Sequence, residues 1–270
     1  MEVLYLVANT ATQFKALEIL KYPDILVSYG SLFYDRIPKW TDNIFVDSGG
    51  YGTILQYGKY ITSDVEYLVF IEKVKPKYFA LRDYACDRSI LKKWNRTAKQ
   101  HIRMTVEHHL RMLDLIDKFN IESEPVPVIQ GSKLEEFLEC LDLFKGYDLL
   151  KFELIGLSGS ISKDLSLEEA RKVIKTLRKE IPKNRKLHLF GIRLNLMKDL
   201  TIFKSIYSAD TVNWDYRSRW KKLDKYKDLD SRVEKSVMYA KEYIKVFENM
   251  KIRSRKVKTI DEIFHSEVII

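Results

Sequence analysis

The chain has 270 residues, of which 46% are hydrophobic and 12% aromatic, with only 10 Gly and 6 Pro. This composition excludes a disordered or low-complexity protein and is sufficient for one large α/β domain or two small ones. A formal net charge of +9 favours a polyanionic partner, nucleic acid first, although a Lys-rich composition is also typical of proteins from hot or AT-rich sources.

Short apolar runs separated by helical patterns recur along the chain and predict strands. The predicted strands are Val3–Ala8, Ile25–Ser28, Ile44–Asp47, Tyr78–Arg82, Val126–Gln130, Leu149–Ile155, Leu187–Ile192 and Thr211–Trp214. The chain enters the first of them without a basic leader and cleavage site. No apolar run approaches the about 20 residues of a membrane span. We therefore expect a soluble protein without a membrane partner, located in the cytoplasm, or in the host cytoplasm if a phage encodes it.

The segments between these strands carry helix signals. Apolar residues recur at helical spacing from Ala98 to Phe119, after Leu134, and in a long final helix from Leu229 to Phe247. Three motifs have the form of a capping box at a helix N-terminus, namely Ser63-x-x-Glu66, Ser132-x-x-Glu135 and Ser166-x-x-Glu169.

Eight predicted strands alternating with helices indicate a (β/α)8 TIM barrel. A doubly wound open sheet is the alternative, because the pattern does not show whether the sheet closes. No low-complexity linker divides the chain. We predict one barrel domain over residues 1–249 and a basic C-terminal extension over 250–270.

Cysteine and histidine patterns predict no metal site. Cys86 and Cys140 are too few and too far apart for a disulfide framework or a four-ligand zinc site, and the five histidines do not complete one. The chain also lacks HExxH, Walker A and GxGxxG motifs.

Polar and small residues follow the predicted strands at their carboxyl ends, where barrel enzymes place their sites. The third strand ends on Asp47, with three glycines close behind it; a tight turn capped by Asp47 is the alternative interpretation. The other strand ends supply Asp83, Gln130, Gly131, Gly156, Phe190, Gly191 and Asp215, and Asp210 directly precedes the eighth predicted strand.

This set suits a purine. Carboxylate and amide groups can pair with the edge of the base, glycines allow close approach, and aromatic rings can stack on it. Two carboxylates also suit exchange at an anomeric carbon, where one attacks C1′ and the other protonates the departing base. A solvated or salt-bridged role is the alternative for each acid.

Several motifs, in order, resemble the tRNA-guanine transglycosylase superfamily. They are Asp47-Ser48-Gly49-Gly50-Tyr51, Val128-Ile129-Gln130-Gly131, Ile155-Gly156-Leu157 and Leu189-Phe190-Gly191-Ile192. The closer resemblance is to its DNA-directed branch, the 7-deazaguanine transglycosylases related to deoxypurine-in-DNA protein A. Three stretches carry it: Ile25–Tyr29, Arg82–Cys86 and Ser208–Trp214. The similarity spans roughly Val3 to Arg219.

The resemblance implies a barrel that exchanges guanine for a 7-deazaguanine such as preQ0 with retention at C1′. By motif position, Asp210 is the nucleophile that forms a covalent glycosyl-enzyme, and Asp47 is the general acid and base. Base recognition falls to Asp83, Gln130, Gly131, Gly156, Phe190 and Gly191, with Tyr51 stacking on the base. No cofactor is needed, because the covalent intermediate retains the bond energy.

Two features depart from the family pattern. The tRNA enzymes carry a Cys3His zinc site in a C-terminal subdomain, and this chain lacks those residues, so we predict a barrel without the zinc-binding subdomain. Asp215 stands near Asp210 where a small polar residue is expected, and it is a rival nucleophile.

Basic residues beside an aromatic follow the last predicted strand. Arg217, Arg219, Trp220, Lys221 and Lys222 suit contact with nucleic-acid phosphates and stacking on bases; a solvated charge run is the alternative. The tail from Lys251 to Lys258 offers similar contacts or is a basic terminus. For His188, strand alternation favours a packed or hydrogen-bonded position inside the barrel.

Three functions remain open on the sequence. The first is guanine exchange in DNA, and the second is exchange in tRNA for queuosine or archaeosine formation. The third is an inert barrel that binds nucleic acid or a base, as the partner subunit of an active enzyme in an oligomer. Acids at both Asp47 and Asp210 argue against the inert barrel, because an inert partner need not keep them.

Overall fold

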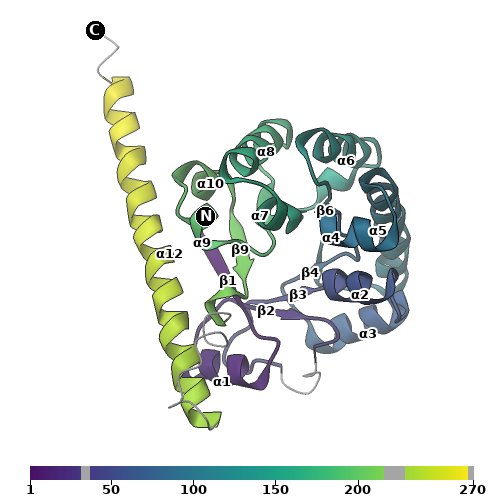
Figure 1. The fold of residues 1–270 in the computed structure, drawn as a ribbon, viewed down its shortest axis with the longest axis horizontal. Helices are drawn as coiled ribbons and strands as arrows, with labels where there is room; N and C mark the ends of the chain where they lie inside the picture. Colours follow the sequence, from purple (N-terminus) through teal and green to yellow (C-terminus); the bar gives the residue numbers. More distant parts are fainter. Residues whose placement is uncertain (32–36, 216–228, 267–270) are drawn as a thin grey trace.

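The computed structural model describes residues 1–31, 37–215 and 229–266, with side chains in the last range described over 230–256. Parallel strands form the centre of the molecule, and helices surround them (Figure 1). The strands are β1 (Val3–Val7), β2 (Ile25–Ser28), β3 (Ile44–Asp47), β4 (Tyr78–Ala80), β5 (Glu124–Val126), β6 (Val128–Ile129), β7 (Leu154–Leu157), β8 (Lys186–Leu189) and β9 (Ser208–Thr211).

The helices fall into two groups. Short helices lie in the segments that follow the carboxyl ends of strands: α2 (Gly50–Tyr57), α4 (Arg88–Trp94), α7 (Ser160–Asp164) and α9 (Leu194–Met197). The other helices are α1 (Ala11–Leu20), α3 (Asp64–Val74), α5 (Ala98–Phe119), α6 (Leu134–Gly146), α8 (Leu167–Glu180), α10 (Leu200–Ser205) and α12 (Leu229–Ser266), with a 3-10 turn η1 at Leu149–Lys151.

The sheet closes through a strand that is broken at one proline. Its order is β5-β4-β3-β2-β1-β9-β8-β7-β6, and β5 and β6 are separated only by Pro127. The carbonyl of Val126 accepts a 2.9 Å hydrogen bond from the Leu81 amide beyond β4, while the next carbonyl, of Pro127, accepts one of 2.8 Å from Gly156 in β7. Successive carbonyls therefore bond to opposite neighbours, as in one strand. Counting β5 and β6 together reduces the nine strands to eight and confirms the predicted (β/α)8 barrel over the open sheet.

Alternate strand residues fill the barrel. The interior cluster is apolar and aromatic and consists of Tyr5, Val7, Leu26, Phe45, Tyr78, Ala80, Val126, Val128 and Leu154, with Phe190 packed against it. A separate, larger cluster lies between the strands and the outer helices. This filled interior leaves the carboxyl ends of the strands as the place where polar side chains gather.

Four predicted strands agree with the structure within two residues at each end. The seventh, Leu187–Ile192, overlaps β8 but was predicted to end three residues too late, and the remaining three differ more. The fifth predicted strand is interrupted at Pro127, which has no N–H for the ladder. The sixth begins at Leu154, because Leu149–Lys151 form a 3-10 turn. The eighth was predicted three residues too late: β9 is Ser208–Thr211, so Asp210 lies within the strand and does not precede it. Its inward residues are polar, so the sequence there lacks the apolar run that predicts a strand.

Helix starts follow the predicted caps at two of three places. Capping boxes are present at Ser63 and Ser166. The box predicted at Ser132 is wrong. Helix α6 begins at Leu134 after Lys133, and Glu136, one residue later than expected, accepts hydrogen bonds from the Ser132 amide at 2.9 Å and hydroxyl at 2.6 Å.

Helix α12 runs along one side of the barrel and extends beyond it (Figure 1). It packs against α1 and α10 through buried residues that include Val233, Ala240 and Phe247. The helix is continuous through Met250, where the predicted extension begins, so the division into domains remains a prediction. Within the described part of the chain, no helix combines the length and the apolar character that crossing a membrane requires.

Candidate active site

Asp47 ends β3 at the mouth of the barrel. In-register pairing sets it beside Ser28, the last residue of β2, which hydrogen-bonds to its carboxylate. The Gly49 amide donates to Asp47 Oδ2 at 3.2 Å. Gly49 has a φ of +70°, and a Cβ there would collide with the Tyr29 carbonyl. Glycine is therefore required for the turn that brings this amide back to the carboxylate.

Asp83 follows β4 and lies beside Asp47. Arg82, buried on the outer side, hydrogen-bonds to the Thr62 carbonyl and hydroxyl, both at 2.7 Å, and so anchors the chain from which Asp83 points inward. One Asp83 oxygen accepts from the Ser48 hydroxyl at 3.3 Å, and the other accepts from the Gln130 side-chain amide. Gln130 in turn accepts from the Cys86 amide at 3.2 Å, so its orientation is fixed.

The charges of these acids influence one another. Burial, and after it the charge of Asp210, raises the pKa of Asp47 to about 6. Hydrogen bonds from Ser28, Gly49 and Ser48 lower the pKa but do not offset this rise. Burial, and then the charge of Asp47, raises the pKa of Asp83 to about 7. Asp47 is therefore electrostatically coupled to both other acids, although Asp210 is far away in sequence. Proton exchange near neutral pH suits a general acid and base.

Asp210 lies in β9, and only one of its carboxylate oxygens, Oδ1, has hydrogen-bond partners among the described residues. Its Oδ1 accepts from the Gly191 amide at 2.9 Å and lies 3.3 Å from His188 Nε2. The residue is only 6% exposed. Among the described residues, the hydrogen bonds to its side chain all go to Oδ1. This arrangement leaves Oδ2 as the oxygen that can attack a substrate.

Asp215, the rival nucleophile, has a different environment. Its Oδ2 accepts from the Gln13 side chain of α1 at 3.0 Å, and its Oδ1 accepts from the Ser236 hydroxyl of α12 at 2.9 Å. The residue is buried, with both oxygens engaged by the outer helices. These contacts favour a role in fixing α1 and α12 to the end of β9.

Phe190, Gly156 and Gly191 meet next to Asp210. The Phe190 ring packs edge-on against Phe45 and His188, with ring centres 5.7 and 4.5 Å apart. A Cβ on Gly156 would lie 2.8 Å from the Phe190 ring, so glycine makes room for it. The other predicted base contact, Gly131, faces away: a Cβ there would meet the Phe137 amide of α6 at 2.8 Å, and its carbonyl accepts from Ser160 at 2.6 Å.

Tyr51 stands at the rim in the first turn of α2 and is 42% exposed. Its hydroxyl accepts a hydrogen bond from Lys163 of α7, whose ammonium lies 3.5 Å from the centre of the tyrosine ring. Lys163 also pairs with Asp87 at 3.2 Å. The contact joins helices that follow β3 and β7, and the predicted stacking of Tyr51 on a base remains a prediction.

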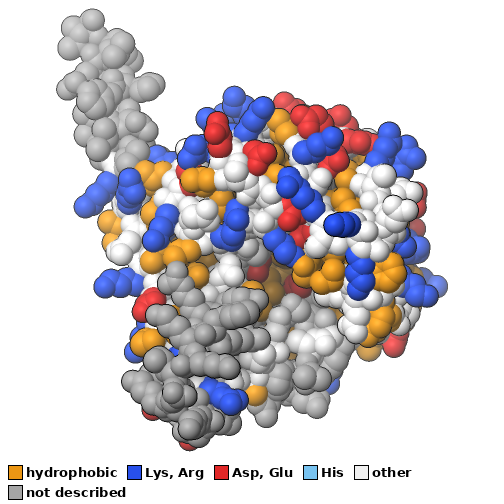
Figure 2. Space-filling model, in the orientation of Figure 1, with side chains coloured by type: hydrophobic (Ala, Val, Ile, Leu, Met, Phe, Trp, Pro, Cys, Tyr) orange, Lys and Arg blue, Asp and Glu red, His pale blue; other side chains and the backbone are white. Residues whose placement is uncertain are grey.

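The predicted nucleic-acid contacts Arg217, Arg219, Trp220, Lys221 and Lys222 lie outside the described residues. In the space-filling view, Lys and Arg side chains are spread over the visible face, while acidic side chains lie along its upper edge and a few lie recessed near its middle (Figure 2). Lys and Arg side chains spread over a surface suit contact with a polyanion.

Three residues were missed as parts of the site. Asn9, two residues after β1, accepts from the Ser28 amide at 2.9 Å and donates to the Ser28 hydroxyl at 3.0 Å. Ser28 in turn hydrogen-bonds to the Asp47 carboxylate. The Ser208 hydroxyl likewise lies 2.9 Å from Nδ1 of His188. The signal for Asn9 and Ser28 was available, because both are polar residues at strand ends.

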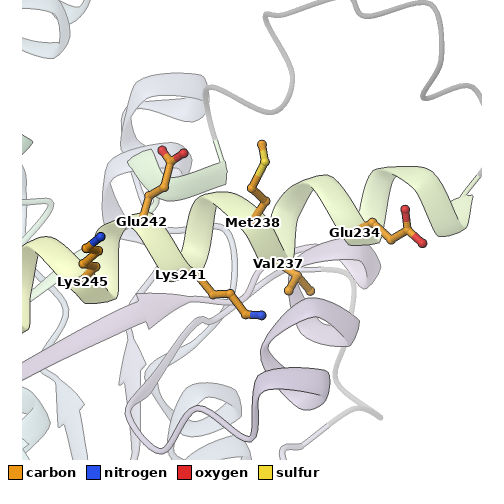
Figure 3. Close-up of a pocket in the computed structure, with 6 residues that line it drawn as sticks. All are labelled: Glu234, Val237, Met238, Lys241, Glu242 and Lys245. Atoms are coloured by element: carbon orange, nitrogen blue, oxygen red, sulfur yellow. The ribbon is translucent and has the colours of Figure 1, made fainter.

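A surface depression elsewhere does not compete with this site. It is lined by Glu234, Val237, Met238, Lys241, Glu242 and Lys245. All six belong to α12, and their side chains project to different sides of the helix without converging on a point (Figure 3). The convergent groups are those at the barrel mouth.

The chain was compared with models of known protein families. The model of a family described as DpdA, DeoxyPurine in DNA protein A, matches residues 23–269. The comparison with curated proteins finds no match.

Proposed function

Because this chain belongs to the deoxypurine in DNA protein A family, we propose that it exchanges guanine in DNA for a 7-deazaguanine base such as preQ0. The family implies a transglycosylase-type enzyme that acts on DNA. The observation that carries the finer proposal is the meeting of Asp47 and Asp210 at the barrel mouth, with the pKa of Asp47 raised to about 6.

The first half-reaction uses both acids. Asp210 Oδ2 attacks C1′ of the deoxyguanosine, forming a C–O bond as the bond from C1′ to the guanine nitrogen breaks. The electron pair of the broken bond stays on guanine, which takes the proton of Asp47. The products are free guanine, ionised Asp47 and a sugar joined to Asp210 as an ester.

The second half-reaction reverses these steps with another base. The 7-deazaguanine gives its proton to ionised Asp47 and attacks C1′, and the ester bond breaks to restore ionised Asp210. Two inversions at C1′ give net retention. Asp83 and Gln130 hold the edge of either base, since ionised Asp83 accepts from the N–H groups of a guanine-like ring.

DNA is favoured over tRNA because the family description names DNA. The test is incubation of the protein with DNA or tRNA labelled in guanine, together with preQ0. We expect labelled guanine to be released from DNA and preQ0 to appear in it, with no release from tRNA. Release from tRNA alone would replace the proposal by queuosine-type or archaeosine-type exchange, and release from neither polymer would contradict both.

Asp210→Asn separates an enzyme from an inert binding subunit. The variant keeps the shape of the side chain but lacks the nucleophilic carboxylate. We expect it to bind DNA normally and to release no guanine. Asp114→Asn, an exposed acid on α5, is the matched control and is expected to exchange like the unmodified protein.

A further inference from the structure

His188 is a completely buried polar residue inside the barrel, below Asp210. It lies on β8 in register with Ser208 of β9, and Asp210 is two residues further along β9, on the same inward face. Its ring contacts three aromatic rings, those of Tyr5, Phe45 and Phe190, with centres 5.9, 4.7 and 4.5 Å away. The ring is therefore confined to one orientation by packing.

Both ring nitrogens have partners. Nδ1 lies 2.9 Å from the Ser208 hydroxyl, and Nε2 lies 3.3 Å from Asp210 Oδ1. The same Oδ1 accepts from the Gly191 amide, so it acts as an acceptor. A carboxylate oxygen accepts from Nε2 only if Nε2 carries a proton, and Nδ1 then accepts from the Ser208 hydroxyl. The chain Ser208–His188–Asp210 ends on one oxygen of the proposed nucleophile.

We propose that His188 is a positioning residue that, supported by Ser208, holds Oδ1 of Asp210 and so directs Oδ2 at C1′. The inference rests on the proposed function. With two donors on Oδ1, the ester formed in the first half-reaction has Oδ1 as its carbonyl oxygen and Oδ2 as its bridging oxygen. The same donors stabilise the carboxylate as it leaves in the second half-reaction, because hydrogen bonds to an ionised group strengthen as charge returns.

Two substitutions separate positioning from packing. His188→Gln can place an amide N–H near the position of Nε2, but it loses the aromatic ring. His188→Phe keeps a ring among the three aromatic neighbours and loses the donor. We expect His188→Phe to lower kcat by about 10- to 100-fold, the range for losing one hydrogen bond to a charged group, with the KM for the incoming base little changed. His188→Gln is expected to retain more activity than His188→Phe.

A purely structural role predicts the opposite order, because phenylalanine preserves the packing better. His188→Phe with activity equal to the unmodified protein, or above that of His188→Gln, would overturn the inference. The matched control is His109→Phe. His109 is also fully buried and packs against an aromatic ring, that of Phe144 at 5.8 Å, but neither of its nitrogens has a hydrogen-bond partner among the described residues. We expect this control to exchange normally.

A measurement that does not depend on catalytic activity tests the positioning role independently of the proposed function. Nitrogen-15 NMR of the histidine rings, with the His188 signal assigned by its loss in His188→Gln, reports which nitrogen carries the proton. We expect a proton on Nε2 and a shift of that signal in Asp210→Asn. A protein that exchanges no base from either polymer would contradict the proposed function alone. A proton on Nδ1, or a His188 signal unchanged by Asp210→Asn, would overturn the positioning role.

Ser208→Ala is the milder variant if both His188 substitutions fail to fold. It leaves the imidazole ring in place and removes only the partner of Nδ1. We expect the His188 signal to shift and kcat to fall by about 3- to 10-fold, consistent with a neutral hydrogen bond. An unchanged His188 signal together with unchanged kcat would contradict the chain of hydrogen bonds.

Discussion

Three acids near one another at a barrel mouth raise the question of how they share protons. Like charges and burial both disfavour ionisation, and both raise the pKa of Asp47, burial first and then the charge of Asp210. Hydrogen bonds from Ser28 and Gly49 work in the other direction. The balance leaves Asp47 able to gain and lose a proton near neutral pH, which both half-reactions require of it.

The first prediction concerns the nucleophile. Asp210→Asn is expected to abolish the covalent protein–DNA adduct that forms when guanine leaves. Asp215→Asn is expected to keep it while lowering the melting temperature, because Asp215 holds Gln13 and Ser236. Denaturing gel electrophoresis with labelled DNA measures the adduct. An adduct that survives in Asp210→Asn and is lost in Asp215→Asn would reverse the assignment.

The second prediction concerns the pH dependence of exchange. The active form needs a proton on Asp47, to give to guanine, and an ionised Asp83, to accept from the base. Their pKa values of about 6 and about 7 therefore predict a bell-shaped kcat/KM with its maximum between these values. The two limbs belong to the coupled acids together. A kcat/KM that rises steadily to pH 9 would contradict this assignment of protons.

For single residues, the sequence identified the acids of the candidate site more readily than the residues that hydrogen-bond to them. Asp47 and Asp83 could be found because each lies at the carboxyl end of a predicted strand, and barrel geometry brings those ends together. Asp210 was predicted to precede its strand, so its role came from the position of its motif in the family resemblance. Asp215 could not be separated from Asp210 in this way, since only the packing of α1 and α12 shows that both of its oxygens are engaged. The His188 contact depends on the register of β8 and β9, which no sequence pattern specifies.

At the scale of elements, β7 and β8 shape the site through one close contact. Gly156 of β7 faces the Phe190 ring that follows β8, and an added methyl group would lie 2.8 Å from the ring and 3.1 Å from Val128. Interiors are packed too densely to absorb such a methyl without movement. The glycine therefore determines where Phe190 lies beside Asp210.

The third prediction tests this contact. Gly156→Ala is expected to displace Phe190, to raise the KM for the incoming base by about 10-fold and to destabilise the fold by about 1–3 kcal/mol, as overpacking does. Adding Phe190→Leu, which shortens the side chain, is expected to restore part of the stability. Gly52→Ala on α2 is the control, because its Cβ would have no neighbour within 4 Å. Equal effects of the two Gly→Ala changes, by calorimetry and kinetics, would contradict the packing argument.

Element prediction from sequence succeeded where local signals agree with the fold. Helix α5 begins and ends at the predicted residues, because Thr97 and Gln100 form a capping box and Asn120 ends the helix in the left-handed conformation. It failed at β9, whose inward residues Ser208 and Asp210 face His188 and break the apolar pattern. The polar residues of the candidate site thus interrupt the apolar pattern of β9, the strand on which they lie.

On the scale of the whole molecule, the charge of the chain and the charge of the site have opposite signs. The net charge is +9, while the barrel mouth gathers Asp47, Asp83 and Asp210. A positive surface favours the DNA backbone, and in the proposed reaction the acids at the barrel mouth act on a neutral base. Keeping these acids close together is costly for the fold, because their ionised forms repel one another where contact with water is reduced.

The fourth prediction is that the site acids destabilise the protein above neutral pH. In the folded chain the pKa values of Asp47 and Asp83 are about 6 and about 7, above the value of about 3.9 for an unfolded Asp. A raised pKa means that the folded chain binds the proton more tightly than the unfolded chain does. The group therefore adds to the free energy of unfolding only while it is protonated in the folded chain. The contribution is therefore complete below about pH 4 and is lost as the pH rises through 6 to 7.

The double variant Asp47→Asn/Asp83→Asn cannot ionise at either position, so it does not suffer this loss. We expect its free energy of unfolding, relative to the unmodified protein, to increase by about 1–3 kcal/mol between pH 5 and pH 8, since each unit of pKa shift corresponds to about 1.4 kcal/mol and partial solvent contact reduces the effect. Urea denaturation at both pH values measures it, with Asp114→Asn as the control. If the difference in free energy of unfolding between the double variant and the unmodified protein stays constant or decreases with pH, ionisation of the two acids does not destabilise the fold. The raised pKa values could then not explain proton transfer by Asp47.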